Sequence, residues 1–245
     1  MNDPHDSNGP NAPNDLAGRL SDIRRRIAIA AQSCGRLPSS VRLIAVSKTF
    51  PIESVRAAYA AGQRDFGENR VQEALQKIAT TTDLSIRWHL IGHLQTNKAR
   101  KAGPAFAMIQ SVDNVELLEK LDRAADEAGR APELLIQVDL AGEATKYGAR
   151  PDEVPRLFEA AAACRAARVA GLMTLPPAPD SPEDARPWFR RLRDLRDEWQ
   201  AAGVDPSMLR ELSMGMSGDF EVAVQEGATL VRIGTAIFGS RDVQQ

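Results

Sequence analysis

The sequence is poor in several kinds of residue, and each scarcity excludes a class of protein. Two cysteines among 245 residues exclude a disulfide framework. No apolar run approaches the ~18 residues of a membrane span, and the N-terminus lacks the basic and then apolar pattern of a signal peptide. The 31 basic and 33 acidic residues nearly balance, so no overall positive field would attract nucleic acid or a membrane. We therefore expect a cytoplasmic globular protein, and the near-neutral charge favours a monomer.

Lysine is scarce as well, because most of the basic residues are arginines. Four of the six lysines fall in predicted helices, where solvated side chains are the simplest expectation; these are Lys77, Lys98, Lys101 and Lys120. The other two are Lys48, which follows an apolar run, and Lys146, which lies in a predicted loop. Any chemistry that needs a buried amine therefore has two candidates.

Eight short apolar segments alternate with amphipathic helices from residue 41 onward. The segments span residues 41–47, 64–69, 86–92, 106–112, 133–139, 168–174, 209–215 and 228–234. Such alternation is typical of a parallel sheet covered by helices, and eight units predict a closed (β/α)₈ barrel. A doubly wound open sheet is the alternative, although no GxGxxG follows the first segment.

The region before the first strand is predicted to contain a tail and one additional helix. Residues 1–14 are rich in proline, asparagine, aspartate and serine and are expected to be disordered. A helix is predicted after Asn14, with an apolar stripe along one face; the stripe is Leu16, Leu20, Ile23, Ile27 and Ala30. Without a linker after this point, residues 15–245 are expected to form a single domain.

The carboxyl ends of the strands are where a barrel places its active site. Lys48 follows the first strand, where apolar walls would lower its pKa and leave the amine free to attack a carbonyl carbon. This position suits a Schiff base. The alternative is a lysine that extends from the barrel rim into solvent.

The last two strands lead into segments rich in glycine, serine and threonine. These segments, residues 213–219 and 232–239, lie where barrels often bind phosphate. A helix is predicted over residues 217–225, with its N-terminus near the anion; ordinary tight turns are the alternative. Arg232 interrupts an apolar strand, so it either points inward to an acceptor such as an aromatic ring nitrogen or pairs outside with a helix carboxylate.

Two histidines, His89 and His93, have the spacing of a zinc-binding helix. Their segment, however, is a predicted strand that ends at Gly92, so the two side chains would not share a helix face. No metal site is predicted.

Seven motifs together resemble the pyridoxal phosphate homeostasis proteins. They are LIAVSKT (43–49), FGENRVQEA (66–74), WHLIGHLQTNKAR (88–100), SVD (111–113), GLMT (171–174), LSMGMSGDFEVAV (212–224) and VRIGTAIFG (231–239). The resemblance runs from about residue 41 to the end of the chain. It implies a barrel like the N-terminal domain of alanine racemase, with pyridoxal 5′-phosphate as the cofactor.

The resemblance also assigns residues to the cofactor site. It implies an internal aldimine on Lys48, Arg232 facing the pyridine nitrogen, and a phosphate held by Gly234, Thr235 and Ser217 with its neighbours. Four further residues are expected in the cofactor pocket, namely Asn69, His89, Met214 and Met216.

For function, the resemblance implies a non-catalytic carrier that holds the cofactor and supplies it to apo-enzymes. An arginine partner leaves the ring nitrogen unprotonated and so weakens the cofactor as an electron sink. The chain also ends soon after its last predicted strand, which leaves no room for the second domain of a racemase. One alternative is a racemase-like enzyme with Lys48 as the sole base and Tyr147 or Lys146 as the partner acid. Another is a Schiff-base aldolase that uses Lys48 without a cofactor.

Overall fold

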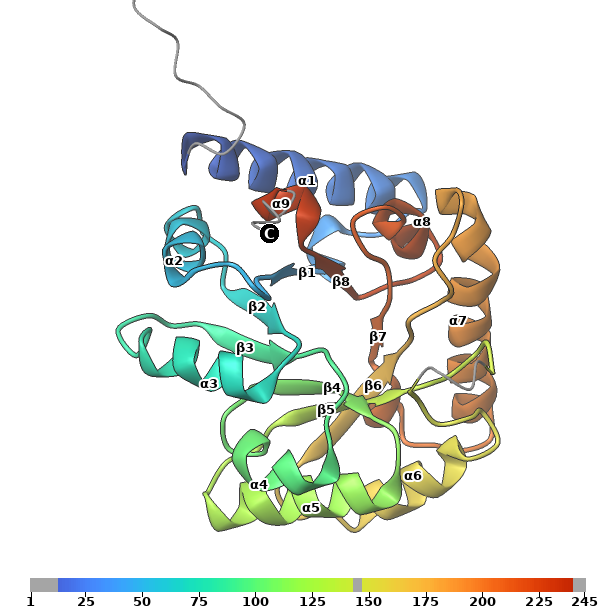
Figure 1. Ribbon diagram of the computed structural model, residues 1–245. Helices are drawn as coiled ribbons and strands as arrows, with labels where there is room; N and C mark the ends of the chain where they lie inside the picture. The colour runs from blue at the N-terminus through green and yellow to red at the C-terminus, as the bar shows by residue number, and fades with distance from the viewer. Residues whose placement is uncertain (1–12, 143–146, 240–245) are drawn as a thin grey trace, which may run out of the picture.

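Eight parallel strands close into a barrel in the computed structural model, which describes residues 13–142 and 147–239 (Figure 1). Neighbouring strands follow the chain order, and β8 pairs with β1 to complete the circle. The strands are β1 Arg42–Val46, β2 Asp65–Glu68, β3 Arg87–Leu90, β4 Met108–Val112, β5 Glu133–Gln137, β6 Arg168–Met173, β7 Glu211–Ser213 and β8 Leu230–Ile233. Each lies within one of the predicted segments. The predicted (β/α)₈ barrel is therefore confirmed, and the open sheet is wrong.

Helices cover the outside of the barrel between the strands (Figure 1). They are α1 Pro13–Ser33, α2 Ile52–Ala60, α3 Val71–Ala79, α4 Ala99–Ala102, α5 Val115–Glu127, α6 Val154–Ala162, α7 Arg186–Ala201, α8 Phe220–Gln225 and α9 Thr235–Phe238. Short 3₁₀ turns add η1 Pro38–Ser40, η2 Thr96–Lys98, η3 Pro182–Ala185 and η4 Pro206–Leu209. In the described part of the chain, no helix has the length and apolar character needed to cross a membrane.

The additional N-terminal helix, α1, packs against α8 and α9 beside the last strand (Figure 1). The predicted stripe is buried, since Leu16, Leu20, Ile23, Ile27 and Ala30 are all buried, together with Ala31. Polar contacts fix its position: Arg19 Nε donates to the carbonyl of Ile237 at 2.6 Å, and Arg26 Nε donates to Glu221 Oε1 at 2.7 Å. The helix begins at Pro13, two residues earlier than predicted. Residues 1–12 of the predicted tail lie outside the described residues.

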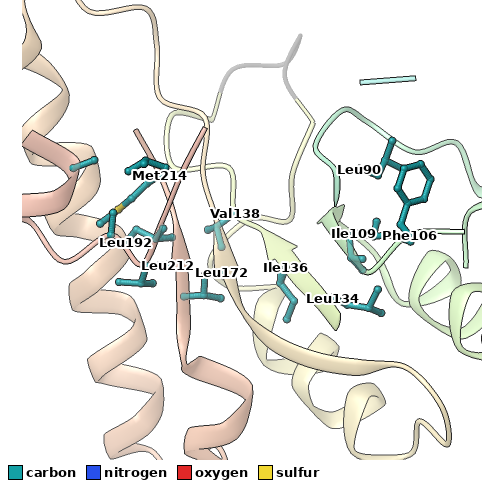
Figure 2. Close-up of a cluster of buried hydrophobic side chains, with 14 of the residues drawn as sticks. Leu90, Phe106, Ile109, Leu134, Ile136, Val138, Leu172, Leu192, Leu212 and Met214 are labelled. Atoms are coloured by element: carbon teal, nitrogen blue, oxygen red, sulfur yellow. The ribbon is translucent and has the colours of Figure 1, made fainter. Parts of the chain in front are cut away.

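On most strands, alternate residues face the two sides of the barrel wall, as the period of a strand requires. The alternation is interrupted on β4 and β6, where the pairing register shifts. On β5, Leu134 and Ile136 belong to the large core between strands and helices, whereas Leu135 belongs to a small apolar cluster inside the barrel. Figure 2 shows part of the outer core, where Leu134 and Ile136 of β5, Leu172 of β6 and Leu212 of β7 follow one another along the barrel wall. This alternation decides which polar residues reach the interior.

Candidate functional site

A cavity of about 590 Å³ opens at the carboxyl end of the barrel. Its wall is built from strand ends and from the segments that follow them, which is why residues far apart in the sequence meet there. Seven of the nine predicted site residues line it; these are Lys48, Asn69, Met216, Ser217, Arg232, Gly234 and Thr235. The other two, His89 and Met214, are not among its lining residues.

Met214 and His89 are buried elsewhere: strand parity explains the position of Met214, and depth along the strand explains that of His89. Met214 belongs to the outer core and lies close to Leu192 of α7 (Figure 2). His89 does point into the barrel, but it lies two residues before Ile91, the residue from the same face that reaches the cavity wall. A motif places a residue near a site, whereas the direction of its side chain depends on the register of the strand.

Lys48 lies in a turn whose backbone is held in an unusual conformation. The next residue, Thr49, has φ of +67°, the left-handed region that β-branched residues rarely adopt. Its N–H donates to Glu73 Oε1 of α3 at 2.6 Å, and this contact stabilises the turn. Lys48 itself is half-buried and lines the cavity. The turn therefore places Lys48 at the wall of the cavity.

The side chain of Lys77 is buried and contacts this turn, so the prediction that it is solvated is wrong. It is only 7% exposed, and its ammonium donates to Glu68 Oε1 at 2.8 Å, to Glu73 Oε1 at 2.9 Å and to the carbonyl of Ser47 at 2.8 Å. The hydroxyl of Ser47 also donates to Glu68 Oε1, at 2.6 Å. Burial raises the pKa of the Glu68 carboxyl, and the hydrogen bonds from Lys77 and Ser47 oppose that rise. The sequence held a signal for this burial, because Lys77 repeats the spacing of the buried Val71 and Ala74 on α3.

Arg232 points into the barrel and is 3% exposed. Its Nη1 donates to Ser213 Oγ at 2.5 Å, and its Nη2 donates to the carbonyl of Thr174 at 2.9 Å. Burial lowers the pKa of its guanidinium to about 10, with Asp219 opposing the shift. The side chain thus stays positively charged at neutral pH and presents that charge to the cavity.

The glycine-rich segments bring backbone close to the cavity, as predicted, but the helix there begins later than expected. α8 starts at Phe220, so Ser217 and Gly218 lie in a turn before it. Gly215 has φ of +92°, and a Cβ at that position would lie 2.5 Å from the Cβ of Ala223. Asp219 Oδ1 accepts the N–H of Met216 at 2.6 Å, which fixes the turn. Hydroxyl and backbone donors from two segments therefore meet at one wall of the cavity.

The rim of the cavity contains residues that the motifs did not assign. The rings of His93 and Tyr147 stack with their centroids 3.5 Å apart and their planes 8° apart. Gln137 Nε2 donates to the carbonyl of Tyr147 at 2.6 Å and ties this segment to β5. Tyr147 is 56% exposed, so it lies at the mouth of the cavity. The other alternative acid, Lys146, lies outside the described residues.

The charges around the cavity favour an anionic ligand. Lys48 and Arg232 line it, and among its described lining residues Asp139 is the only acidic one. Asp139 Oδ1 already accepts the N–H groups of Ala141 at 3.1 Å and Gly142 at 3.0 Å. An amine, a guanidinium and a wall of hydroxyl and backbone donors suit a molecule that carries both a carbonyl group and a phosphate.

Known proteins share this fold and match most of the length of this chain. The family model of the alanine racemase N-terminal domain matches residues 19–242. A pyridoxal phosphate homeostasis protein of Aquifex aeolicus is 44% identical over 223 residues, which cover 91% of this chain and 97% of the relative. The protein of the same name from Pseudomonas aeruginosa is also 44% identical, over 93% of this chain and 96% of its own.

Solved structures agree with these relatives. PipY of Synechococcus elongatus with pyridoxal phosphate bound is 44% identical, with a TM-score of 0.80 over 91% of this chain and 100% of PipY. An alanine racemase of Clostridium difficile has a TM-score of 0.71 over 94% of this chain and 58% of the racemase, at 14% identity, and so shares the fold alone. The chain belongs to the alanine racemase N-terminal domain family and, within it, to the pyridoxal phosphate homeostasis proteins.

Proposed function

We propose that this chain binds pyridoxal 5′-phosphate in the cavity at the carboxyl end of the barrel and holds it for delivery to apo-enzymes. The observation that carries the proposal is that Lys48 and Arg232 reach the same cavity, beside walls rich in hydroxyl and backbone donors. The cofactor is an aldehyde, a phosphate ester and an aromatic ring nitrogen in one molecule, and this cavity has a group suited to each. The pyridoxal phosphate bound to PipY supports the same ligand here.

Seven of the lining residues have a proposed role. The amine of Lys48 would form a C=N bond with the aldehyde carbon, and the aldehyde oxygen would leave as water. Arg232 directs an N–H at the ring nitrogen. Ser217, Gly234 and Thr235 hold the phosphate, while Asn69 and Met216 line the rest of the cavity. His89 and Met214 are not proposed as contacts, because neither lines the cavity.

A carrier suits these groups better than an enzyme does. Pyridoxal phosphate supplies an electron sink that works best when its ring nitrogen is protonated, and a permanent guanidinium has no capacity to accept that proton. Tyr147 is largely exposed and stacked on His93, an arrangement unlike a buried, poised acid. The homeostasis names of the relatives support the same view. We further propose a cytoplasmic monomer. Exchange of an amino acid's α-proton for deuterium at an enzyme-like rate would overturn the carrier proposal.

Replacing Lys48 tests the proposal directly. The purified protein, loaded with pyridoxal phosphate, is expected to show the visible absorption band of a Schiff base, and Lys48→Ala is expected to lack it. Lys98→Ala is the control, because Lys98 is exposed and does not line the cavity, and it is expected to keep the band. Borohydride reduction followed by peptide mass spectrometry identifies the modified lysine. A band that persists in Lys48→Ala, with the label on Lys146, would contradict the assignment.

Replacing Arg232 tests which group faces the ring nitrogen. In Arg232→Glu a carboxylate replaces the guanidinium, so the ring nitrogen is expected to become protonated and the cofactor's absorption spectrum to change. Arg232→Gln, which keeps an N–H donor without the charge, shows whether the change comes from the charge or from lost packing. Circular dichroism checks that both variants fold. A spectrum identical to that of the wild type at full occupancy would show that Arg232 does not contact the ring.

A further inference from the structure

An unbroken line of hydrogen bonds crosses the interior of the barrel from Arg232 to Asp65. Arg232 Nη1 lies 2.5 Å from Ser213 Oγ, and Ser213 Oγ lies 2.7 Å from Gln110 Oε1. Gln110 Nε2 lies 3.2 Å from His89 Nδ1, and His89 Nε2 lies 2.9 Å from Asp65 Oδ1. The line joins strands β8, β7, β4, β3 and β2. It therefore depends on the closed barrel and on no single segment of sequence.

Every member of this line is buried. Ser213 and Gln110 are fully buried, and His89, Arg232 and Asp65 are each less than 5% exposed. Polar groups in such surroundings are costly unless each is paired. The line ends at its far side on an ion pair, because Asp65 Oδ2 accepts from Arg87 Nη2 at 2.6 Å.

The chemistry of the groups sets the direction of every hydrogen bond. A guanidinium only donates, so Ser213 accepts from Arg232 and its own hydrogen goes to Gln110 Oε1. The amide nitrogen of Gln110 then faces His89 and also the sulfur of Met108, at 3.7 Å. His89 Nδ1 must accept, which leaves its hydrogen on Nε2, directed at Asp65.

The protonation states agree with this direction. Burial lowers the pKa of His89, although the hydrogen bond to Asp65 opposes the shift, and the imidazole is therefore neutral. Burial opposes ionisation of Asp65, but hydrogen bonds from His89 and Arg87 hold its pKa below the usual value. The line thus runs from a cation to an anion, with all of its hydrogens pointing the same way.

We infer that Ser213, Gln110 and His89 are positioning residues that fix the orientation of Arg232 in the interior of the barrel. Parallel alignment of the hydrogen bonds strengthens each of them in a low-dielectric interior. The guanidinium is then held rigidly toward the cavity. This inference rests on the proposed function only for what Arg232 faces, since the line itself exists without any ligand.

The test measures Arg232 in the protein without cofactor. In the wild type, nitrogen-15 NMR is expected to show slow hydrogen exchange at the Arg232 guanidinium and, for His89, a neutral ring protonated at Nε2. Only three histidines need to be assigned. Ser213→Ala removes the acceptor of Nη1 and is expected to speed the exchange by about tenfold or more, as loss of one hydrogen bond to a charged group implies.

The matched control is Ser111→Ala. Ser111 neighbours Gln110 on β4 and is equally buried, yet within the described part of the chain its Oγ has no hydrogen-bond partner. Exchange at Arg232 is expected to stay at the wild-type rate in this variant. Gln110→Met is a second break in the line, and it is expected to shift the His89 Nδ1 resonance as well as to speed exchange at Arg232.

Three results would overturn the inference: unchanged exchange in Ser213→Ala, equal changes in Ser213→Ala and Ser111→Ala, or a His89 ring protonated at Nδ1. If Ser213→Ala does not fold, the same two resonances in Gln110→Met decide the question. Failure of the proposed function has a different signature, because a protein that never binds pyridoxal phosphate would still give the expected exchange rates and histidine signals. With cofactor bound, Ser213→Ala is further expected to change the absorption spectrum, and Ser111→Ala to leave it unchanged.

Discussion

Lys77→Met is expected to lower the free energy of unfolding by about 3–5 kcal/mol, the cost of removing one partner from a buried ion pair. Glu68 is 0% exposed and would lose the ammonium that its Oε1 contacts at 2.8 Å. Methionine has the length of the lysine side chain, so the change isolates the charge and its three hydrogen bonds from packing. Urea unfolding monitored by circular dichroism at neutral pH measures the effect.

Lys120→Met is the control, because Lys120 also pairs with a glutamate four residues away, Glu116 at 2.7 Å, but on the exposed face of α5. Such a pair contributes only about 0.3–0.5 kcal/mol. Equal losses in the two variants would mean that burial of Lys77 adds nothing to its ion pair. We also expect Lys77→Met to weaken cofactor binding, because the turn that holds Lys48 loses its contact at the carbonyl of Ser47.

Most of the eight strands were predictable because strands buried on both faces are largely apolar, and that pattern depends on local sequence alone. The direction of a side chain, into or out of the barrel, is harder to predict from local sequence. Met214 lies in a motif of the site, yet its side chain belongs to the outer core and does not line the cavity. A shift of one residue in register exchanges the two faces of a strand, and sequence motifs do not determine the register.

Lys77 shows a second limit of prediction from the sequence. Lysine is so rarely buried that a helical lysine is expected to be solvated, and that expectation outweighed its position on the apolar face of α3. What reverses the expectation is the pair of carboxylates that it meets, Glu68 from β2 and Glu73 from its own helix. The hydrogen-bonded line from Arg232 to Asp65 could not be predicted from the sequence either. Its members come from five different strands, so they meet only in the closed barrel.

Gly92→Ala is expected to damage both stability and the site, since this glycine lies against the backbone of Asn69. A Cβ at position 92 would lie 2.3 Å from the carbonyl oxygen of Asn69 and 2.8 Å from its Cα, closer than carbon atoms approach in proteins. Either the end of β3 or the segment after β2 must move, and overpacking of this kind costs about 1–3 kcal/mol or more. Asn69 lines the cavity, so the affinity for pyridoxal phosphate is expected to fall as well.

Gly218→Ala separates this clash from a general effect of adding a methyl group at the cavity. Gly218 lines the same cavity, but a Cβ there would have no atom within 4 Å, and its φ lies outside the left-handed region. Its unfolding free energy is expected to stay the same or rise by about 0.4–1 kcal/mol, because alanine restricts the unfolded chain. Thermal unfolding and titration with pyridoxal phosphate are measured on both variants. If Gly92→Ala binds the cofactor as tightly as the wild type does, then the position of Asn69 does not matter to the site, and its proposed place in the cofactor pocket is wrong.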